Sequence, residues 1–192
     1  MSYEIRIILG TMVIEKLIAQ VGAVSANRGI AKITDTVGLS DHATPVAAVY
    51  AVLNQTGDYG SAVLPSASFI AATVAHEHGN CDMKAELVYQ TIMNKPQLQN
   101  MIADTTVHRV FIAGHAFCIL SDLGLPAGAG PYDIADFGDD AVVCDLWQED
   151  CWTPNTWLPH GTIPGVERLF WRGKIKTNQI TIIRSFDFAC SV

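Results

Sequence analysis

Three residues that together can carry out nucleophilic catalysis occur along the chain in the order Cys81, His115 and Asp145. A thiol becomes an effective nucleophile beside an imidazole, because the imidazole takes up the thiol proton and returns it to a leaving amine. A carboxylate next to the imidazole fixes its tautomer and stabilises the imidazolium. These residues therefore predict a Cys–His–Asp triad, provided that the fold brings the three side chains together.

Cys81 is the first residue of a predicted helix. Asn80 is a favourable N-cap, and apolar residues recur at helical spacing from Cys81 to Ile92 until Pro96 ends the segment. The unpaired amide groups and the dipole at a helix N-terminus favour an anion, which here would be the thiolate. The backbone N–H of Cys81 is also placed to donate a hydrogen bond to an oxyanion.

Strand patterns follow this helix. Val107–Leu120 is rich in β-branched and aromatic residues, with Gly114 as a bulge or turn, and Ala141–Trp147 and Gln179–Phe188 are two further strands. Side chains alternate between the faces of a strand. The alternation therefore places His115 and Asp145 away from the faces that carry Cys118 and Cys144.

The first eighty residues carry helical patterns instead. These cover Met1–Val21 with an interruption at Gly10, Ser40–Gly57 and Ser66–Gly79. Helices first and strands later predict an α+β fold. We expect one domain over residues 1–192, with a mainly helical part at 1–78. Residues 79–192 would place the Cys-bearing helix against an antiparallel sheet.

Composition excludes several classes of function. Hydrophobic residues make up 49% of the chain and the formal net charge is −7, which argues for a large core and against a nucleic-acid binder. The five cysteines form no CxxC pair, which argues against a structural zinc framework, and so large an apolar core favours reduced thiols over a disulfide scaffold. We expect neither a metal nor a cofactor. Charges at Arg6, Glu15 and Lys16 interrupt the apolar segment Ile5–Ile18, which favours a packed helix over membrane contact and gives no cleavable signal peptide.

Three short motifs carry a resemblance to a known family. Gly79-Asn80-Cys81, Gly114-His115-Ala116-Phe117 and Val143-Cys144-Asp145-Leu146-Trp147 resemble motifs of the papain-like and transglutaminase-like superfamily, and more narrowly its bacterial toxin and effector branch. The similarity spans Gly79 to Trp147, about a third of the chain. It implies a papain-like fold, acyl transfer at amides, and Cys81, His115 and Asp145 as the catalytic residues.

The resemblance also implies a substrate class and a place of action. It favours a cysteine-dependent amide hydrolase that deamidates glutamine or asparagine side chains of a target protein, with a cysteine protease as the close alternative. Such an effector is secreted by a specialised system and acts in the cytoplasm of a host or competitor cell. We expect a short, restricted pocket at Cys81, because the loop Gly124–Asp140 falls between the strands of the triad and forms a candidate rim.

The chain departs from the family pattern at two points. Leu146 stands where many relatives have proline, and no glutamine precedes Cys81 at the papain-type oxyanion position. Asn80, His76 or the more distant Gln55 could supply the second oxyanion donor. Trp147 could shield the acid–base pair from water.

Two other classes of function remain open. His76, His78 and Cys81, together with His115, offer imidazole and thiolate ligands for a zinc site. Alternatively, the chain is a binding module that keeps the superfamily fold and uses its apolar N-terminal half to bind a partner.

Overall fold

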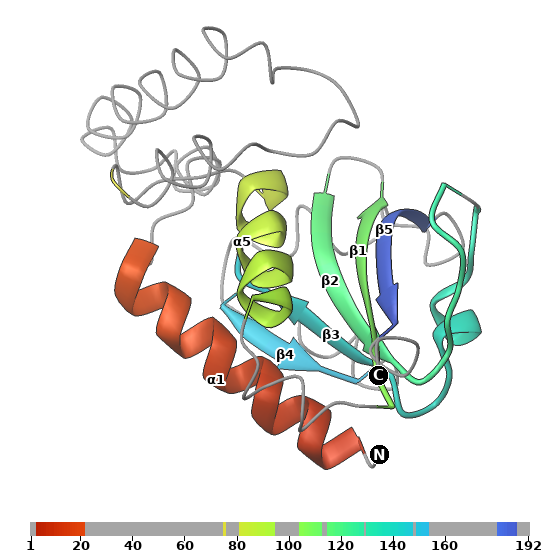
Figure 1. The fold of residues 1–192 in the computed structure, drawn as a ribbon, viewed down its shortest axis with the longest axis horizontal. Helices are drawn as coiled ribbons and strands as arrows, with labels where there is room; N and C mark the ends of the chain where they lie inside the picture. Colours follow the sequence, from red (N-terminus) through yellow and green to blue (C-terminus); the bar gives the residue numbers. More distant parts are fainter. Residues whose placement is uncertain are drawn as a thin grey trace, which may run out of the picture.

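The computed structural model describes residues 3–21, 75, 81–94, 104–112, 115–128, 130–147, 149–153 and 180–187. They form an α+β structure with two long helices and an antiparallel sheet of five strands (Figure 1). The helices are α1 (Tyr3–Val21) and α5 (Cys81–Met93), and a short 3-10 helix, η1, covers Ile134–Phe137. The strands are β1 (Thr106–Ile112), β2 (His115–Ser121), β3 (Val142–Asp145), β4 (Asp150–Trp152) and β5 (Thr181–Asp187). Their order in the sheet is β4-β3-β2-β1-β5.

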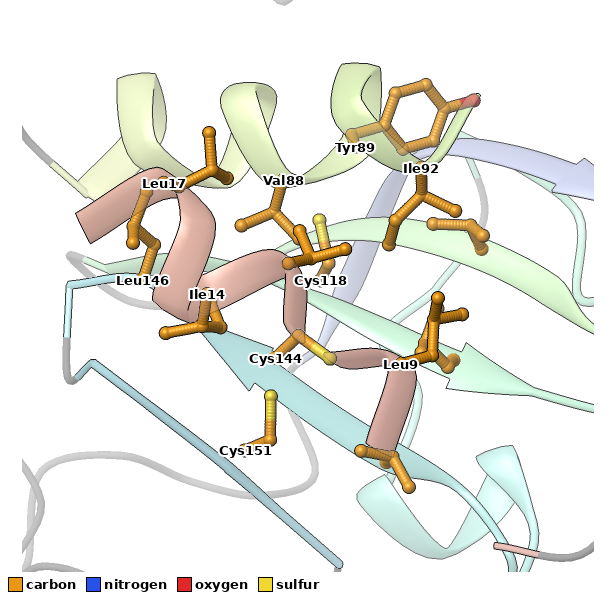
Figure 2. Close-up of a cluster of buried hydrophobic side chains, with 14 of the residues drawn as sticks. Leu9, Ile14, Leu17, Val88, Tyr89, Ile92, Cys118, Cys144, Leu146 and Cys151 are labelled. Carbon is orange, nitrogen blue, oxygen red and sulfur yellow. The ribbon is translucent and has the colours of Figure 1, made fainter. Parts of the chain in front are cut away.

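Both helices pack on the same face of the sheet. A buried cluster joins apolar side chains of α1 and α5 to inward-facing residues of β1, β2 and β3, among them Val107, Cys118 and Cys144 (Figure 2). The opposite face forms a second core, in which Phe117 and Ile119 of β2 pack with Phe137 of η1. Because alternate residues of β2 enter different cores, every residue of this strand is buried.

Arg6 ties α1 to the sheet. Its side chain is fully buried, and its Nε donates to Thr105 Oγ1 at 3.2 Å while one terminal nitrogen donates to the carbonyl of Asp140 at 2.9 Å. Thr105 directly precedes β1, and Asp140 lies two residues before β3. Arg6 interrupts the apolar pattern of this segment, and its guanidinium anchors α1 by donating hydrogen bonds to groups beside β1 and β3.

The helix prediction at the N-terminus needs one correction. Helix α1 runs without interruption through Gly10, which was expected to break it. A Cβ at Gly10 would lie 2.5 Å from Cys144 Sγ and 2.8 Å from Cys151 Sγ. The glycine is thus explained by the close approach of α1 to β3 and β4 and not by a break in the helix.

The strand predictions were coarser than the sheet. Val107–Leu120, expected as one strand with a bulge or turn, is two antiparallel strands, and Gly114 falls between them. Strand β3 is shorter than the expected Ala141–Trp147, because Leu146 and Trp147 are turn residues. The strand β4 was not predicted. The expected helices Ser40–Gly57 and Ser66–Gly79 lie outside the described residues, apart from the helical Ala75, and the division of the chain at residues 78 and 79 stays a prediction.

The expected loop Gly124–Asp140 contains a short helix and contacts the sheet through a few buried or bridging residues, while most of its other residues are exposed. Asp133 caps η1 and forms a capping box with Asp136, and Phe137 is fully buried against the sheet. Tyr132 also forms a bridge with Ile180 next to β5. This segment supplies one side of the second core, and its role as a rim for substrate stays a prediction.

Replacing Gly10 with alanine tests the close contact of α1 with the sheet. Alanine favours an exposed helix by about 1 kcal/mol over glycine, whereas overpacking a core costs about 1–3 kcal/mol. Because the new methyl group would meet two sulfur atoms, we expect Gly10→Ala to lower the thermal midpoint. The control is Thr11→Ala on the exposed side of α1, which should leave it unchanged or raise it. A Gly10→Ala protein as stable as Thr11→Ala would contradict the packing.

Candidate active site

Cys81 lies at the N-terminus of α5, as its position in the sequence predicted. Its side chain is nearly buried, with 9% of the residue exposed. The first amide groups of a helix have no partner within the helix, so this end presents N–H donors and the positive end of the helix dipole. The thiol therefore lies in a position suited to a negatively charged sulfur.

His115 connects Cys81 to Asp145. Its Nε2 donates to Asp145 Oδ2 at 2.5 Å, and its side chain is also hydrogen-bonded to the Cys81 thiol. Since Nε2 is used by the carboxylate, Nδ1 is the ring nitrogen that remains for the sulfur. The structure thus brings together the three residues that the sequence predicted as a triad, from the start of α5, the start of β2 and the end of β3.

The remaining oxygen of Asp145 is also bonded. Its Oδ1 accepts a hydrogen bond from the backbone N–H of Trp147 at 2.9 Å, within the turn that follows β3. The residue is 1% exposed. A carboxylate with so little contact with water requires compensating partners, and it has them at both oxygen atoms. The turn therefore fixes the direction in which Asp145 presents Oδ2 to His115.

Aromatic rings surround the imidazole. The Trp147 ring packs edge-on against His115 with 5.2 Å between ring centroids, and the Phe117 ring lies at 5.7 Å in a tilted arrangement. His115 is 3% exposed and Trp147 2% exposed. Trp147 therefore covers the imidazole, in the position from which it was predicted to shield the acid–base pair from water. Its backbone N–H also positions Asp145.

Opposing influences act on the charge of His115. Burial alone lowers the pKa of this imidazole, but the charge of Asp145, its hydrogen bond, and the hydrogen bond and charge of Cys81 all raise it. The net result is a pKa of about 10, compared with an ordinary value of 6.5. His115 therefore carries a proton near neutral pH and forms a buried ion pair with Asp145.

A network of ion pairs holds the start of α5 against the sheet. Arg109 on β1 pairs with Asp82, the residue after Cys81, and its Nε lies 3.0 Å from Glu86 Oε2 one turn further along α5. Arg184 on β5 lies 3.0 Å from the other oxygen of Glu86. Glu86 is fully buried. The helix that carries Cys81 is therefore fixed to β1 and β5 by charges on its first two turns.

This network was missed at the sequence level. A charged residue within the apolar strand Thr106–Ile112 requires a partner, and Asp82 and Glu86 are four residues apart on one helix face. These two local signals were available. The acid that pairs with Arg109 is determined by how the helix lies on the sheet. No local sequence pattern gives that orientation.

Three other thiols, Cys118, Cys144 and Cys151, lie in the helix-facing core, away from the triad. Cys118 Sγ donates to the carbonyl of Ala85 at 3.2 Å, and burial raises the pKa of Cys118 well above its ordinary value. For Cys144, a hydrogen bond with Cys151 and burial raise the pKa in the same way. The prediction that Cys118 and Cys144 face away from His115 and Asp145 agrees with the core to which they belong.

The other predicted site residues cannot be placed. Asn80, His76, His78 and Gln55 lie outside the described residues, as does Cys190. Among the residues that are described, no group of three or more His, Cys, Asp or Glu side chains could hold a metal ion. The same part of the chain contains no helix long and apolar enough to cross a membrane.

The charge on His115 predicts how stability depends on pH. The folded-state pKa of about 10 lies above the ordinary 6.5, so the stabilisation is complete below pH 6.5 and is lost as the pH rises through about 10. We expect the wild-type free energy of unfolding to fall over this window by an amount on the order of a few kcal/mol.

Asp145→Asn is the matched variant for this measurement, because it keeps the shape and removes the charge that raises the pKa. Urea titrations at several pH values should give a much flatter profile for the variant between pH 6.5 and 10. Parallel profiles for the two proteins would show that the ion pair does not form.

The ion-pair network predicts a contrast between its buried base, Arg109, and its exposed acid, Asp82. Removing one partner of a buried pair costs about 3–5 kcal/mol, whereas an exposed pair contributes about 0–1 kcal/mol. Glu86 is fully buried and the Asp82 side chain is 51% exposed. We therefore expect Arg109→Met to destabilise the protein strongly and Asp82→Asn to have little effect in urea unfolding. Equal losses would argue against a buried role for Arg109.

The chain was also compared with known proteins. No protein-family model, no curated protein and no solved structure matches it. Its function must therefore be argued from the arrangement of Cys81, His115 and Asp145.

Proposed function

We propose that this chain is a cysteine-dependent amide hydrolase with a papain-like arrangement of its catalytic residues. The observation that carries the proposal is the buried imidazole of His115, bonded at Nε2 to Asp145 and also hydrogen-bonded to the thiol of Cys81. A core histidine needs no nucleophile beside it, whereas a catalytic base does. The placement of that nucleophile at a helix N-terminus adds independent support.

The reaction follows from the positions of these groups. Protonated His115 stabilises the Cys81 thiolate, which attacks the carbonyl carbon of an amide and forms a tetrahedral oxyanion. The first backbone N–H groups of α5 are the donors proposed for that oxyanion. His115 then gives its proton to the leaving nitrogen, and the C–N bond breaks to leave a thioester on Cys81.

The second half of the reaction restores the enzyme. A water molecule replaces the released amine, and His115, now neutral, takes one of its protons as the oxygen attacks the thioester carbon. The carbon–sulfur bond breaks and the carboxylic acid product leaves. Asp145 keeps the imidazole oriented throughout and stabilises its charged form in both halves of the cycle.

The substrate that we propose is a glutamine or asparagine side chain of a protein. Cys81 is only 9% exposed, and a narrow approach suits one primary carboxamide better than an extended peptide on both sides of a bond. We further propose, from the resemblance of the three motifs, that the chain is a secreted effector or toxin. It would act on a protein in the cytoplasm of a host or competitor cell, without a cofactor.

A lysate experiment tests both the chemistry and the substrate class. Wild-type protein should release ammonia from a responsive cell lysate and raise the mass of its target by about 1 Da for each carboxamide converted to an acid. Cys81→Ala should abolish the reaction, and Asp145→Asn should slow it by roughly 10²–10⁴-fold. Unchanged thermal midpoints for Cys81→Ala would show that the loss is chemical.

Three outcomes would contradict parts of the proposal. New protein N-termini that depend on Cys81 would identify a protease instead. A target that is captured equally by wild type and Cys81→Ala, with no ammonia released, would identify a binding module. Full activity in Cys81→Ala would exclude the thiol mechanism altogether.

A further inference from the structure

Three cysteines lie in one row across the sheet. Cys118 on β2 is the register partner of Cys144 on β3, and Cys144 is the partner of Cys151 on β4. Directly opposed residues on antiparallel strands have Cα atoms about 4.5–5.5 Å apart, within the span of about 4.4–6.8 Å that a disulfide requires. The backbone therefore permits two pairings, and both of them use Cys144.

The side chains distinguish between the two pairings. Cys118 directs its sulfur to the carbonyl of Ala85 on α5, at 3.2 Å, whereas Cys144 is hydrogen-bonded to Cys151. The sulfur atoms of Cys144 and Cys151 also lie against the same backbone position of α1, at Gly10. Figure 2 shows these two sulfur atoms near one another and the sulfur of Cys118 turned toward α5.

We propose that Cys144 and Cys151 form a redox site that closes to a disulfide between β3 and β4. Both thiols are reduced in the structure. The oxidant is a small disulfide of the glutathione class. The Cys151 thiolate attacks one sulfur of this molecule and releases one reduced thiol, which leaves a mixed disulfide. Cys144 then gives up its proton as its sulfur attacks the Cys151 sulfur, and the second thiol is released. Two thiol protons and two electrons leave the protein in total.

The position of β4 explains how an oxidant reaches a covered pair. Strand β4 has three residues and, among the strands that the structure describes, stands at the edge of the sheet next to β3. Short edge strands open more easily than central ones. Cys151 on this edge retains 8% exposure, whereas Cys144 is completely buried. Cys151 is therefore the thiol that meets the oxidant, and Cys144 is the thiol that resolves the mixed disulfide.

The disulfide would act on the strand that carries the acid of the candidate site. Cys144 directly precedes Asp145, and the register partner of Asp145 is Asp150, next to Cys151. A covalent link at this point prevents β4 from separating from β3. Formation of the link does not depend on the proposed hydrolase activity, so the two proposals can fail separately.

Peptide mapping after exposure to oxidised glutathione tests the inference. Wild-type protein is incubated with glutathione disulfide, alkylated under denaturing conditions and digested. We expect an internal cross-link between Cys144 and Cys151 and a loss of about 2 Da for the two hydrogen atoms removed. The rate at which the backbone amides of β4 exchange with deuterium should then fall by at least about tenfold.

Two serine variants from the same row serve as controls. Cys151→Ser should remove the cross-link, and Cys118→Ser should leave it intact, because its hydroxyl can still donate to Ala85. A link between Cys118 and Cys144 would overturn the assignment. The proposal would also be wrong if wild-type protein formed no internal link by the time the β4 amides had fully exchanged. Full exchange shows that the strand has opened while the oxidant was present. The wild-type map decides even where a variant fails to fold.

Discussion

The buried ion pair between His115 and Asp145 is the interaction on which the site depends. Neither side chain has appreciable contact with water, so each charge is stable only while the other is in place. The pair in turn requires one register between β2 and β3, in which Cys118 faces Cys144. A slip of one residue would turn Asp145 to the helix-facing side of the sheet. The same slip would leave two buried charges without compensation, and the electrostatics of the site and the register of the sheet therefore specify each other.

The two faces of the sheet have different tasks. Residues of β2 and β3 that face α1 and α5 have apolar or thiol side chains, and they bury the apolar sides of the two helices. Residues of the other face, Phe117 among them, form a core with η1, and His115 belongs to this alternation at the start of β2. Cys81 reaches the imidazole because it begins its helix at the same end of β2, and Arg109 fixes that end of the helix through Asp82. The candidate site is thus assembled at the first residue of β2, beside the start of α5.

Local signals were sufficient to predict part of this arrangement. The helix start at Cys81 and the strand faces of His115 and Asp145 follow from spacing within single segments, and the α+β order follows from the sequence of those segments. The role of Gly10 and the existence of β4 could not be obtained in this way. Helix propensity alone predicts a break at a glycine within a helical pattern. Here the glycine instead allows α1 to lie close to Cys144 and Cys151, more than a hundred positions away in the sequence. A three-residue strand carries too few alternations to be distinguished from a turn.

The partnership of Arg109 with Glu86 shows why buried charge is harder to predict than buried apolar surface. An apolar side chain packs with almost any neighbour of suitable size, but a buried guanidinium requires carboxylates placed at particular positions around it. Such a pair adds little stability compared with an apolar replacement, and its value is that it disfavours other placements of the helix. A helix carrying a nucleophile gains from this restriction, since displacements of about 1 Å can separate the reacting groups. The distance between the Cys81 sulfur and its base therefore depends on two ion pairs. Arg109 and Glu86 fix the position of the helix, and Asp145 fixes the position of His115.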